Sequence, residues 1–320
     1  MFPAFLESYK NGSLERLSEK TFALLESCAI CPRKCRVNRL KNEKGVCKTG
    51  LLPRVCSYMP HHGEEPPVSG SRGSGTIFFS NCNMSCVYCQ NYEFSQEGEG
   101  KEVSFEELAE FMLSLQGLGC HNINLVSPTH VMPQILKSLF IAINKGLKIP
   151  IVYNTGGYEL EETIKLLEGI IDIYMPDMRY GDAQSAVKYS NAPDYPVYNQ
   201  NAVKEMHNQV GVAKINKEGI IYKGLIIRHL VLPQGISGTD KIMQFISREL
   251  SKESFVSLMS QYFPCYKAGE LREVNRRISY EEYEQAKKIM HGYGLYNGWT
   301  QEAGGLERFA GINIKSIFKK

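Results

Sequence analysis

The feature that most constrains this chain is a loop with three cysteines that directly follows a short apolar strand. Thr76 to Phe79 is a run of apolar or β-branched residues and predicts a buried strand. The loop after it carries Cys82, Cys86 and Cys89 in the spacing CxxxCxxC. Three thiolates this close together in the chain can converge on one metal centre.

Two kinds of metal centre use thiolates in this way. A structural zinc ion takes four protein ligands, and the residues that follow Cys89 offer no His or further Cys. A zinc site would therefore need a distant fourth ligand such as Cys56. Iron–sulfur clusters also bind thiolates, and a four-iron cluster held by three cysteines keeps one iron open to a small molecule. We favour the cluster, because a catalytic centre requires an open position.

A second group of cysteines lies nearer the N-terminus. Cys28, Cys31, Cys35 and Cys47 have the spacing Cx2Cx3Cx11C, and Gly45 allows a turn before the last of them. Four thiolates can close a tetrahedral structural site, and an auxiliary iron–sulfur cluster would use the same ligands. We favour the closed structural site over the auxiliary cluster and over unligated core cysteines.

Composition is that of a soluble globular enzyme. Of 320 residues, 43% are hydrophobic and 22% are charged, and the net charge of +3 implies neither a nucleic-acid nor a membrane partner. The N-terminus lacks a signal-peptide pattern, and no apolar run is long enough to cross a membrane. Seven of the ten cysteines fall in the two groups, which favours metal chemistry in a reducing cytoplasm over a secreted disulfide scaffold.

Strands alternate with helices from Thr76 onward, which predicts a parallel sheet in an α/β fold. The expected strands are 76–79, 122–126, 150–153, 170–174, 223–231 and 255–258. Six strands are too few for an eightfold barrel, so we expect a partial (β/α)6 TIM-like barrel. The expected helices are 11–26 with Ser13 as a cap, 105–115 with a capping box at Ser104, 131–145, 159–167, two within 181–210, 239–250 and 281–291.

Two domains are expected. Residues 1–72 would hold the first helix, the four-cysteine module and a connecting loop, and residues 73–320 would hold the barrel with a C-terminal extension. Within the first domain, residues 61–70 contain two Pro and two Gly and predict an irregular loop. The His and Glu side chains of this loop would either meet a ligand or only hold the loop.

In parallel α/β folds, ligands bind at the carboxyl ends of the strands. The polar residues at these ends are Ser127, Thr129, Asn154, Asp177, Arg228 and His229. For Asp177 the alternative is a salt bridge with Arg179 or with another basic residue at the rim of the barrel. Arg228 and His229 are neighbours in a strand, so only one of them faces the barrel interior.

These residues complete a resemblance. The segment Cys82 to Cys89, with Tyr88 before the last cysteine, resembles the radical SAM superfamily. Three further segments resemble its pyruvate formate-lyase activating-enzyme-like branch: Tyr153-Asn154-Thr155-Gly156-Gly157-Tyr158, Met175-Pro176-Asp177 and Arg228-His229-Leu230-Val231-Leu232-Pro233. Cys28 to Cys35 and His62 to Pro67 are similar to the PflX-type subgroup of that branch.

The resemblance implies a [4Fe-4S] cluster on Cys82, Cys86 and Cys89 whose open iron binds S-adenosylmethionine. Reductive cleavage of that molecule yields a 5′-deoxyadenosyl radical, which abstracts hydrogen from a substrate. The residues expected to bind the nucleotide are Tyr88, Ser127, Thr129, Asn154, Asp177 and His229. The Gly-Gly-Glu run of many relatives is absent after the second strand, where Ser127 to His130 stand. The branch also implies an oxygen-sensitive cytoplasmic enzyme that receives electrons from flavodoxin or ferredoxin.

The substrate stays open at this point. One version of the enzyme activates a partner protein by making a glycyl radical, and another modifies a small molecule or a different polypeptide. The four-cysteine module precedes the CxxxCxxC loop, whereas the ferredoxin insert of some activases follows it, which argues against the activase version. A hypothesis from another class is a binding protein stabilised by zinc at both cysteine groups.

Overall fold

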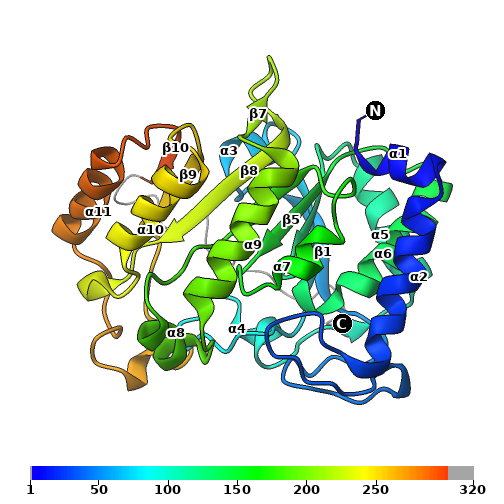
Figure 1. Cartoon of the computed structure of the whole chain (residues 1–320), viewed down its shortest axis with the longest axis horizontal. Coiled ribbons are helices and arrows are strands. Elements are labelled where there is room, and N and C mark those ends of the chain that lie inside the picture. Colours follow the sequence, from blue (N-terminus) through cyan, green and yellow to red (C-terminus); the bar gives the residue numbers. More distant parts are fainter. Residues whose placement is uncertain (1, 302–320) are drawn as a thin grey trace.

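A computed structural model describes residues 2–301 of the chain (Figure 1). In that part, ten strands form one sheet in the order β10-β9-β8-β6-β5-β4-β2-β1-β3, and β7 pairs with β8. The strands are β1 (Arg54–His61), β2 (Ser74–Phe79), β3 (Lys101–Glu102), β4 (Ile123–Val126), β5 (Ile151–Thr155), β6 (Ile173–Pro176), β7 (Lys214–Ile215), β8 (Ile221–Leu230), β9 (Phe255–Met259) and β10 (Gly298–Thr300).

The sheet is mostly parallel and is not closed. Strands β2, β4, β5, β6, β8, β9 and β10 pair in parallel one after the other. At one edge β1 runs antiparallel to β2 and carries β3. All six strands expected from the sequence are present, and the α/β partial barrel is confirmed. β10 adds a seventh parallel strand that is only three residues long.

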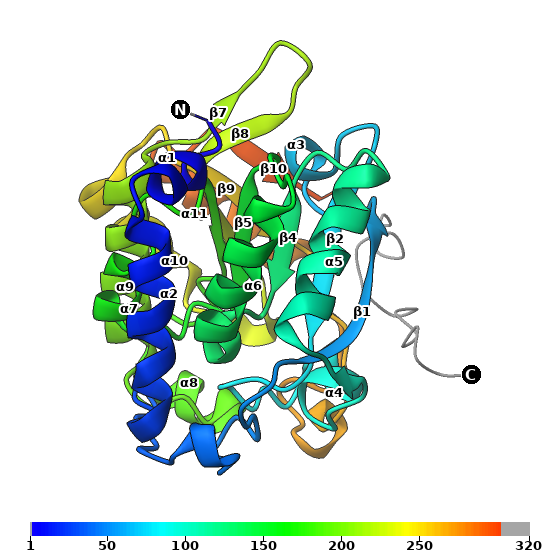
Figure 2. The same ribbon diagram turned by 90° about the vertical axis from the view of Figure 1, so that its right-hand side faces the viewer.

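Helices cover the outer face of the sheet (Figure 2). The α-helices are α1 (Phe5–Lys10), α2 (Ser13–Ala23), α3 (Pro66–Ser69), α4 (Tyr92–Ser95), α5 (Phe105–Gly117), α6 (Met132–Asn144), α7 (Glu161–Lys165), α8 (Ala183–Ser190), α9 (Tyr195–Val210), α10 (Thr239–Phe245) and α11 (Tyr280–Gly292). Shorter helical turns are η1 (Leu24–Ser27), η2 (Arg39–Lys41), η3 (Thr129–Val131), η4 (Pro233–Gly235), the π-helical η5 (Ile246–Leu250) and η6 (Ala268–Glu270). The capping box at Ser104 is confirmed, since its side chain accepts from the amide of Glu107 and its amide donates to the Glu107 carboxylate.

Two expectations about the N-terminal third were wrong. Ser13 is the first residue of α2, and its cap is Gly12 with a φ of 71°. Residues 61–70 are not irregular throughout, because β1 extends to His61 and α3 begins at Pro66. Proline suits the first turn of a helix, where its missing amide has no partner to lose. The boundary expected at residue 72 falls in the connection between two paired strands, β1 and β2.

The sheet is buried on both faces. On the outer face its side chains and the helices form the main core, which includes Ile77, Leu125 and Ile227. On the inner face Val68 of α3 packs with a smaller cluster that includes Val152, Ile173 and Ile226. α3 therefore closes the amino end of the barrel interior, on the opposite side of the molecule from α4 (Figure 1).

Candidate active site

A cavity of about 610 Å³ lies inside the barrel, a volume in the range of small-molecule sites. It extends from Asn91, directly before α4, to Pro66, the first residue of α3. Its other lining residues are His61, Gly63, Glu64, Glu65, Phe78, Tyr88, Cys89, Gln90, Val126, Asn154, Asp177, Arg179, Arg228, Leu230, Ser257, Met259, Gln261, Trp299, Thr300 and Gln301. The cavity thus connects the CxxxCxxC loop to the closed end of the barrel.

Each sulfur of the CxxxCxxC loop has a hydrogen-bonding neighbour. Cys82 Sγ accepts from the Met84 amide at 3.4 Å, and Cys86 Sγ accepts from the Ser190 hydroxyl at 3.0 Å. Cys89 Sγ lies 3.1 Å from the hydroxyl of Ser95. Donors of this kind stabilise thiolates over thiols.

The three thiols also influence one another electrostatically. Burial, with smaller contributions from Cys86 and Cys89, raises the pKa of Cys82 to about 12, and the guanidinium of Arg179 opposes this rise. Buried thiols with such pKa values become thiolates at neutral pH when a cationic centre binds them. Three cysteines of one loop, of which Cys89 lines the open cavity, therefore supply the thiolates that an iron–sulfur cluster with an accessible iron would need.

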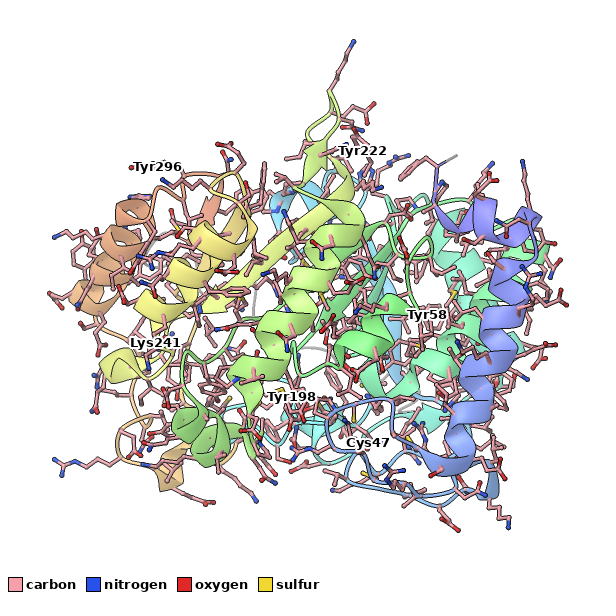
Figure 3. All side chains as sticks on the ribbon, in the orientation of Figure 1. Cys47, Tyr58, Tyr198, Tyr222, Lys241 and Tyr296 are labelled. Carbon is pink, nitrogen blue, oxygen red and sulfur yellow. The ribbon has the colours of Figure 1, made fainter. Side chains whose placement is uncertain are left out.

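The four cysteines of the N-terminal module enclose a much smaller space. Cys28, Cys31, Cys35 and Cys47 line a cavity of about 10 Å³. Arg39 is 1% exposed, and its Nη1 donates to His130 O at 2.8 Å and lies 3.7 Å from Cys28 Sγ. Figure 3 shows Cys47 on the same side of the molecule as α4 and α8. Between residues 2 and 301, no group of three or more Cys, His, Asp or Glu side chains has an arrangement that could hold a single metal ion.

Arg33 links this module to the CxxxCxxC loop. Its Nε donates to Asn83 O at 2.7 Å, and its Nη2 donates to Asn191 O after α8. Its guanidinium also lies 5.3 Å from the ring centroid of Tyr158. The module and the loop are therefore in direct contact.

A layer of charged and amide side chains crosses the cavity. Arg228 Nε donates to Asp177 Oδ1 at 2.8 Å, and Arg179 Nη2 donates to Asp177 Oδ2 at 2.5 Å. Glu64 lies 3.7 Å from Arg228 Nη1, and it accepts from Asn154 Nδ2 at 3.4 Å. The salt bridge between Asp177 and Arg179, the alternative considered from the sequence, is thus present.

The loops after β5 and β6 are held together by α9. Asn199 Nδ2 donates to Gly157 O at 3.0 Å and to Asp177 O at 2.9 Å. Gly157 has a φ of 76°, and a Cβ there would lie 2.3 Å from Asp177 O. Only glycine fits this close approach in a left-handed conformation, which explains the second glycine of the Thr155-Gly156-Gly157 run.

The structure separates the expected nucleotide-binding residues into two sets. Tyr88, Asn154 and Asp177 line the cavity. His229 does not, because the alternation of β8 turns Arg228 inward and His229 outward. His229 is fully buried, and its ring nitrogens lie 2.7 Å from Met178 O and 2.9 Å from Thr239 Oγ1.

Ser127 and Thr129 are also absent from the cavity lining. Ser127 has a φ of 58° in the turn after β4, and its amide donates to Asn154 O at 2.9 Å. The Thr129 hydroxyl donates to the buried carboxylate of Glu159 at 2.5 Å. The backbone of Ser127 thus holds the turn and the Thr129 side chain binds Glu159, and neither residue lines the cavity where the ligand was expected.

Several cavity residues were not singled out from the sequence. Ser257, Gln261, Trp299 and Gln301 come from β9, β10 and the segments after them, and a strand of three residues has too little pattern to be predicted. Cys265, which belongs to neither cysteine group, is half-buried, and its thiol donates to the backbone oxygen of Tyr88 at 3.3 Å. Cys56 packs with Phe78 and Phe94. In the described part of the chain, no helix combines the length and hydropathy needed to traverse a bilayer.

Comparisons with known proteins agree with this arrangement. Residues 76–191 match the family model "Radical SAM superfamily". An uncharacterized protein of Methanocaldococcus jannaschii is 32% identical over 300 residues, covering 91% of this chain and 82% of that protein. A second uncharacterized protein of this organism is 24% identical over 282 residues, covering 80% of this chain and 78% of that protein.

The fold is also similar to a solved structure. A radical SAM methyltransferase from Sphaerobacter thermophilus superimposes with a TM-score of 0.51 at 14% identity, over 75% of this chain and 69% of that one. At this identity the likeness concerns the fold alone. Residues 76–191 are therefore a radical SAM superfamily domain, and enzymes of this superfamily bind a [4Fe-4S] cluster and S-adenosylmethionine.

Proposed function

We propose that this chain is a radical SAM enzyme in which Cys82, Cys86 and Cys89 are the protein ligands of the [4Fe-4S] cluster. The observation that carries the proposal is that the loop of these three cysteines, each sulfur beside a hydrogen-bonding neighbour, reaches one end of the cavity of about 610 Å³ through Cys89. These residues would hold the cluster, and the chemistry that it would supply there is one-electron reduction of S-adenosylmethionine, which would make a hydrogen-abstracting 5′-deoxyadenosyl group available for the substrate.

The residues that line the cavity would bind and orient the nucleotide, and they would exclude water. Asn154 and the carboxylate of Asp177 face the cavity and offer hydrogen bonds to the hydroxyl and amino groups of the nucleotide. The two guanidiniums on Asp177 fix its orientation. Phe78, Val126, Leu230 and Met259 form an apolar part of the wall, which keeps water from a reactive radical.

For the N-terminal module we propose a closed tetrahedral metal site on Cys28, Cys31, Cys35 and Cys47. The four thiols share a cavity of only about 10 Å³, and metal binding would have to draw them into a tetrahedral arrangement that they do not have here. We also propose two domains that meet near residue 72, and the pairing of β1 with β2 joins them.

Within the superfamily, we propose that this chain belongs to the PflX-type subgroup of the pyruvate formate-lyase activating-enzyme-like branch. The His62 to Pro67 segment supports this assignment, since its two glutamates line the cavity. A cytoplasmic location and electron supply by flavodoxin or ferredoxin go with it. The substrate is either a small molecule or a polypeptide.

The test is anaerobic reconstitution of the full chain with iron and sulfide. We expect brown protein with about four irons at the CxxxCxxC site, and release of 5′-deoxyadenosine when dithionite and S-adenosylmethionine are added. Colourless protein that contains only zinc and releases no 5′-deoxyadenosine would instead support the zinc-stabilised binding protein.

A further inference from the structure

The two ends of the cavity differ in chemistry. The end at Cys89 and Asn91 belongs to the CxxxCxxC loop, and the other end is formed by Glu64, Glu65 and Pro66 before and at the start of α3. α3 and α4 lie on opposite sides of the molecule in both views (Figures 1 and 2). The glutamates therefore belong to the part of the cavity remote from the cysteines.

The charges that line the cavity do not balance. Three carboxylates, of Glu64, Glu65 and Asp177, face two guanidiniums, of Arg179 and Arg228. Both guanidiniums are hydrogen-bonded to Asp177, and Arg228 also lies 3.7 Å from Glu64. The lining contains no lysine, and each arginine is therefore already engaged.

Glu65 is the carboxylate left over. Its residue is 7% exposed, its Oε2 has no hydrogen-bond partner, and no cation in the described part of the chain forms an ion pair with it. The remaining basic group of the lining, His61, is half-buried, and burial lowers its pKa. It is therefore neutral near pH 7 and supplies no positive charge there.

We propose that the inner end of this cavity binds a cationic group of the substrate, a protonated amine, amidine or guanidine, through the carboxylate of Glu65. An unpaired buried carboxylate is costly, and a cation from the ligand would give it a charge-assisted hydrogen bond. The inference rests on the proposed function, because it assumes that the cysteine end of the cavity holds the cluster and the nucleotide.

A different arrangement would need no cation. Burial raises the pKa of Glu65 to about 7, and Glu64 adds to the rise, while Arg228 opposes it. The two adjacent carboxyl groups would then share a proton, and the cavity would prefer neutral ligands. The two arrangements predict opposite ligand preferences.

Small probes distinguish them. Binding of n-butylammonium and methylguanidinium to the reconstituted protein is compared with binding of their neutral counterparts, 1-butanol and N-methylurea, by ligand-observed NMR at pH 7.5. We expect the cations to bind at least about tenfold more tightly. Equal binding of cations and neutral molecules, or a preference for the neutral ones, would overturn the proposal.

Variants locate the effect. Glu65→Gln should remove the preference for cations, whereas Glu19→Gln, an exposed glutamate on α2, should keep it. A folded Glu65→Gln protein that still prefers cations would refute the role of this carboxylate. If that variant does not fold, the comparison of cations with neutral probes on the unaltered protein still decides whether the cavity selects positive charge.

Measurements with and without S-adenosylmethionine separate the two proposals. Probes that bind together with the nucleotide support a substrate subsite, and probes that compete with it would assign Glu65 to the nucleotide and overturn the inference. Release of 5′-deoxyadenosine is measured on the same preparation. A retained preference for cations without cleavage counts against the proposed function alone, and cleavage without such a preference counts against the subsite alone.

Discussion

The two cysteine groups of this chain lie side by side and have opposite surroundings. The CxxxCxxC loop has three thiols and opens on a cavity of about 610 Å³, whereas the N-terminal module has four thiols around about 10 Å³. Structural metal sites are closed by protein ligands, and catalytic centres keep a position open. The comparison teaches that the number of cysteines matters less than the space beside them, and in the proposed function catalysis belongs to the loop and stability to the module.

The largest effect should come from removing a ligand of the loop. Cys82→Ala should abolish 5′-deoxyadenosine formation and lower the iron content by about four atoms per chain, while the N-terminal module keeps its metal. Product analysis by chromatography and metal analysis by mass spectrometry measure both quantities. Cys120→Ala, which alters a buried cysteine of the main core, is the control and should retain cleavage. Cleavage by the Cys82 variant would end the assignment of this ligand.

Removing a ligand of the module should have a different signature. Cys31→Ser should release the metal of the module and lower the free energy of unfolding by about 4 kcal/mol or more, as loss of a structural metal does. Denaturant unfolding of the reconstituted protein measures the change. The loop thiols are unaltered in this variant, so the remaining folded protein should still bind iron. A variant of undiminished stability would show that the module is not a structural metal site.

The stability of the barrel should also depend on pH, for a reason that is independent of both metal centres. Burial lowers the pKa of His229 to about 4, and the pKa in the unfolded chain is about 6.5. Neutral His229 therefore stabilises the fold above pH 6.5, and this contribution falls as the pH decreases from 6.5 towards 4, by about 2 kcal/mol at pH 5.

The metal-free protein isolates this effect. Its unfolding free energy should fall less steeply between pH 6.5 and pH 5 in His229→Gln than in the unaltered chain. Exposed His62 provides the control, and His62→Gln should leave the slope unchanged. Identical slopes in all three proteins would mean that the buried imidazole does not control acid stability.

The strands and the cysteine loop were easier to predict from the sequence than the residues that line the cavity. The six parallel strands and the loop cysteines follow from local patterns, since apolar runs and cysteine spacing are visible in one short segment. Which of Arg228 and His229 faces the cavity depends on how β8 pairs with β6, where Arg228 lies beside Asp177. No local sequence pattern shows this pairing. Ser127 lies at the end of its strand as expected, but a positive φ turns the chain there. Trp299 joins the cavity through a strand too short to recognise.

The smallest effect should come from the contact between the two cysteine groups. Arg33 donates to Asn83 O inside the CxxxCxxC loop, so the module should hold the loop in the conformation that binds iron. Arg33→Ala should loosen the loop by about 1–2 kcal/mol, the contribution of a charged hydrogen bond. This corresponds to a faster loss of cluster iron, by about 5- to 30-fold.

The rate at which a chelator removes iron under anaerobic conditions measures this loosening. Lys41→Ala is the matched control, because it removes an exposed cation of the same module whose side chain forms no hydrogen bond or ion pair with the loop. This variant should leave the rate unchanged. Arg33→Lys keeps the charge and loses the forked geometry, so an intermediate rate is expected. An unchanged rate in Arg33→Ala would show that the closed site and the open site are neighbours without mechanical coupling, and the module would then stabilise only its own segment of the chain.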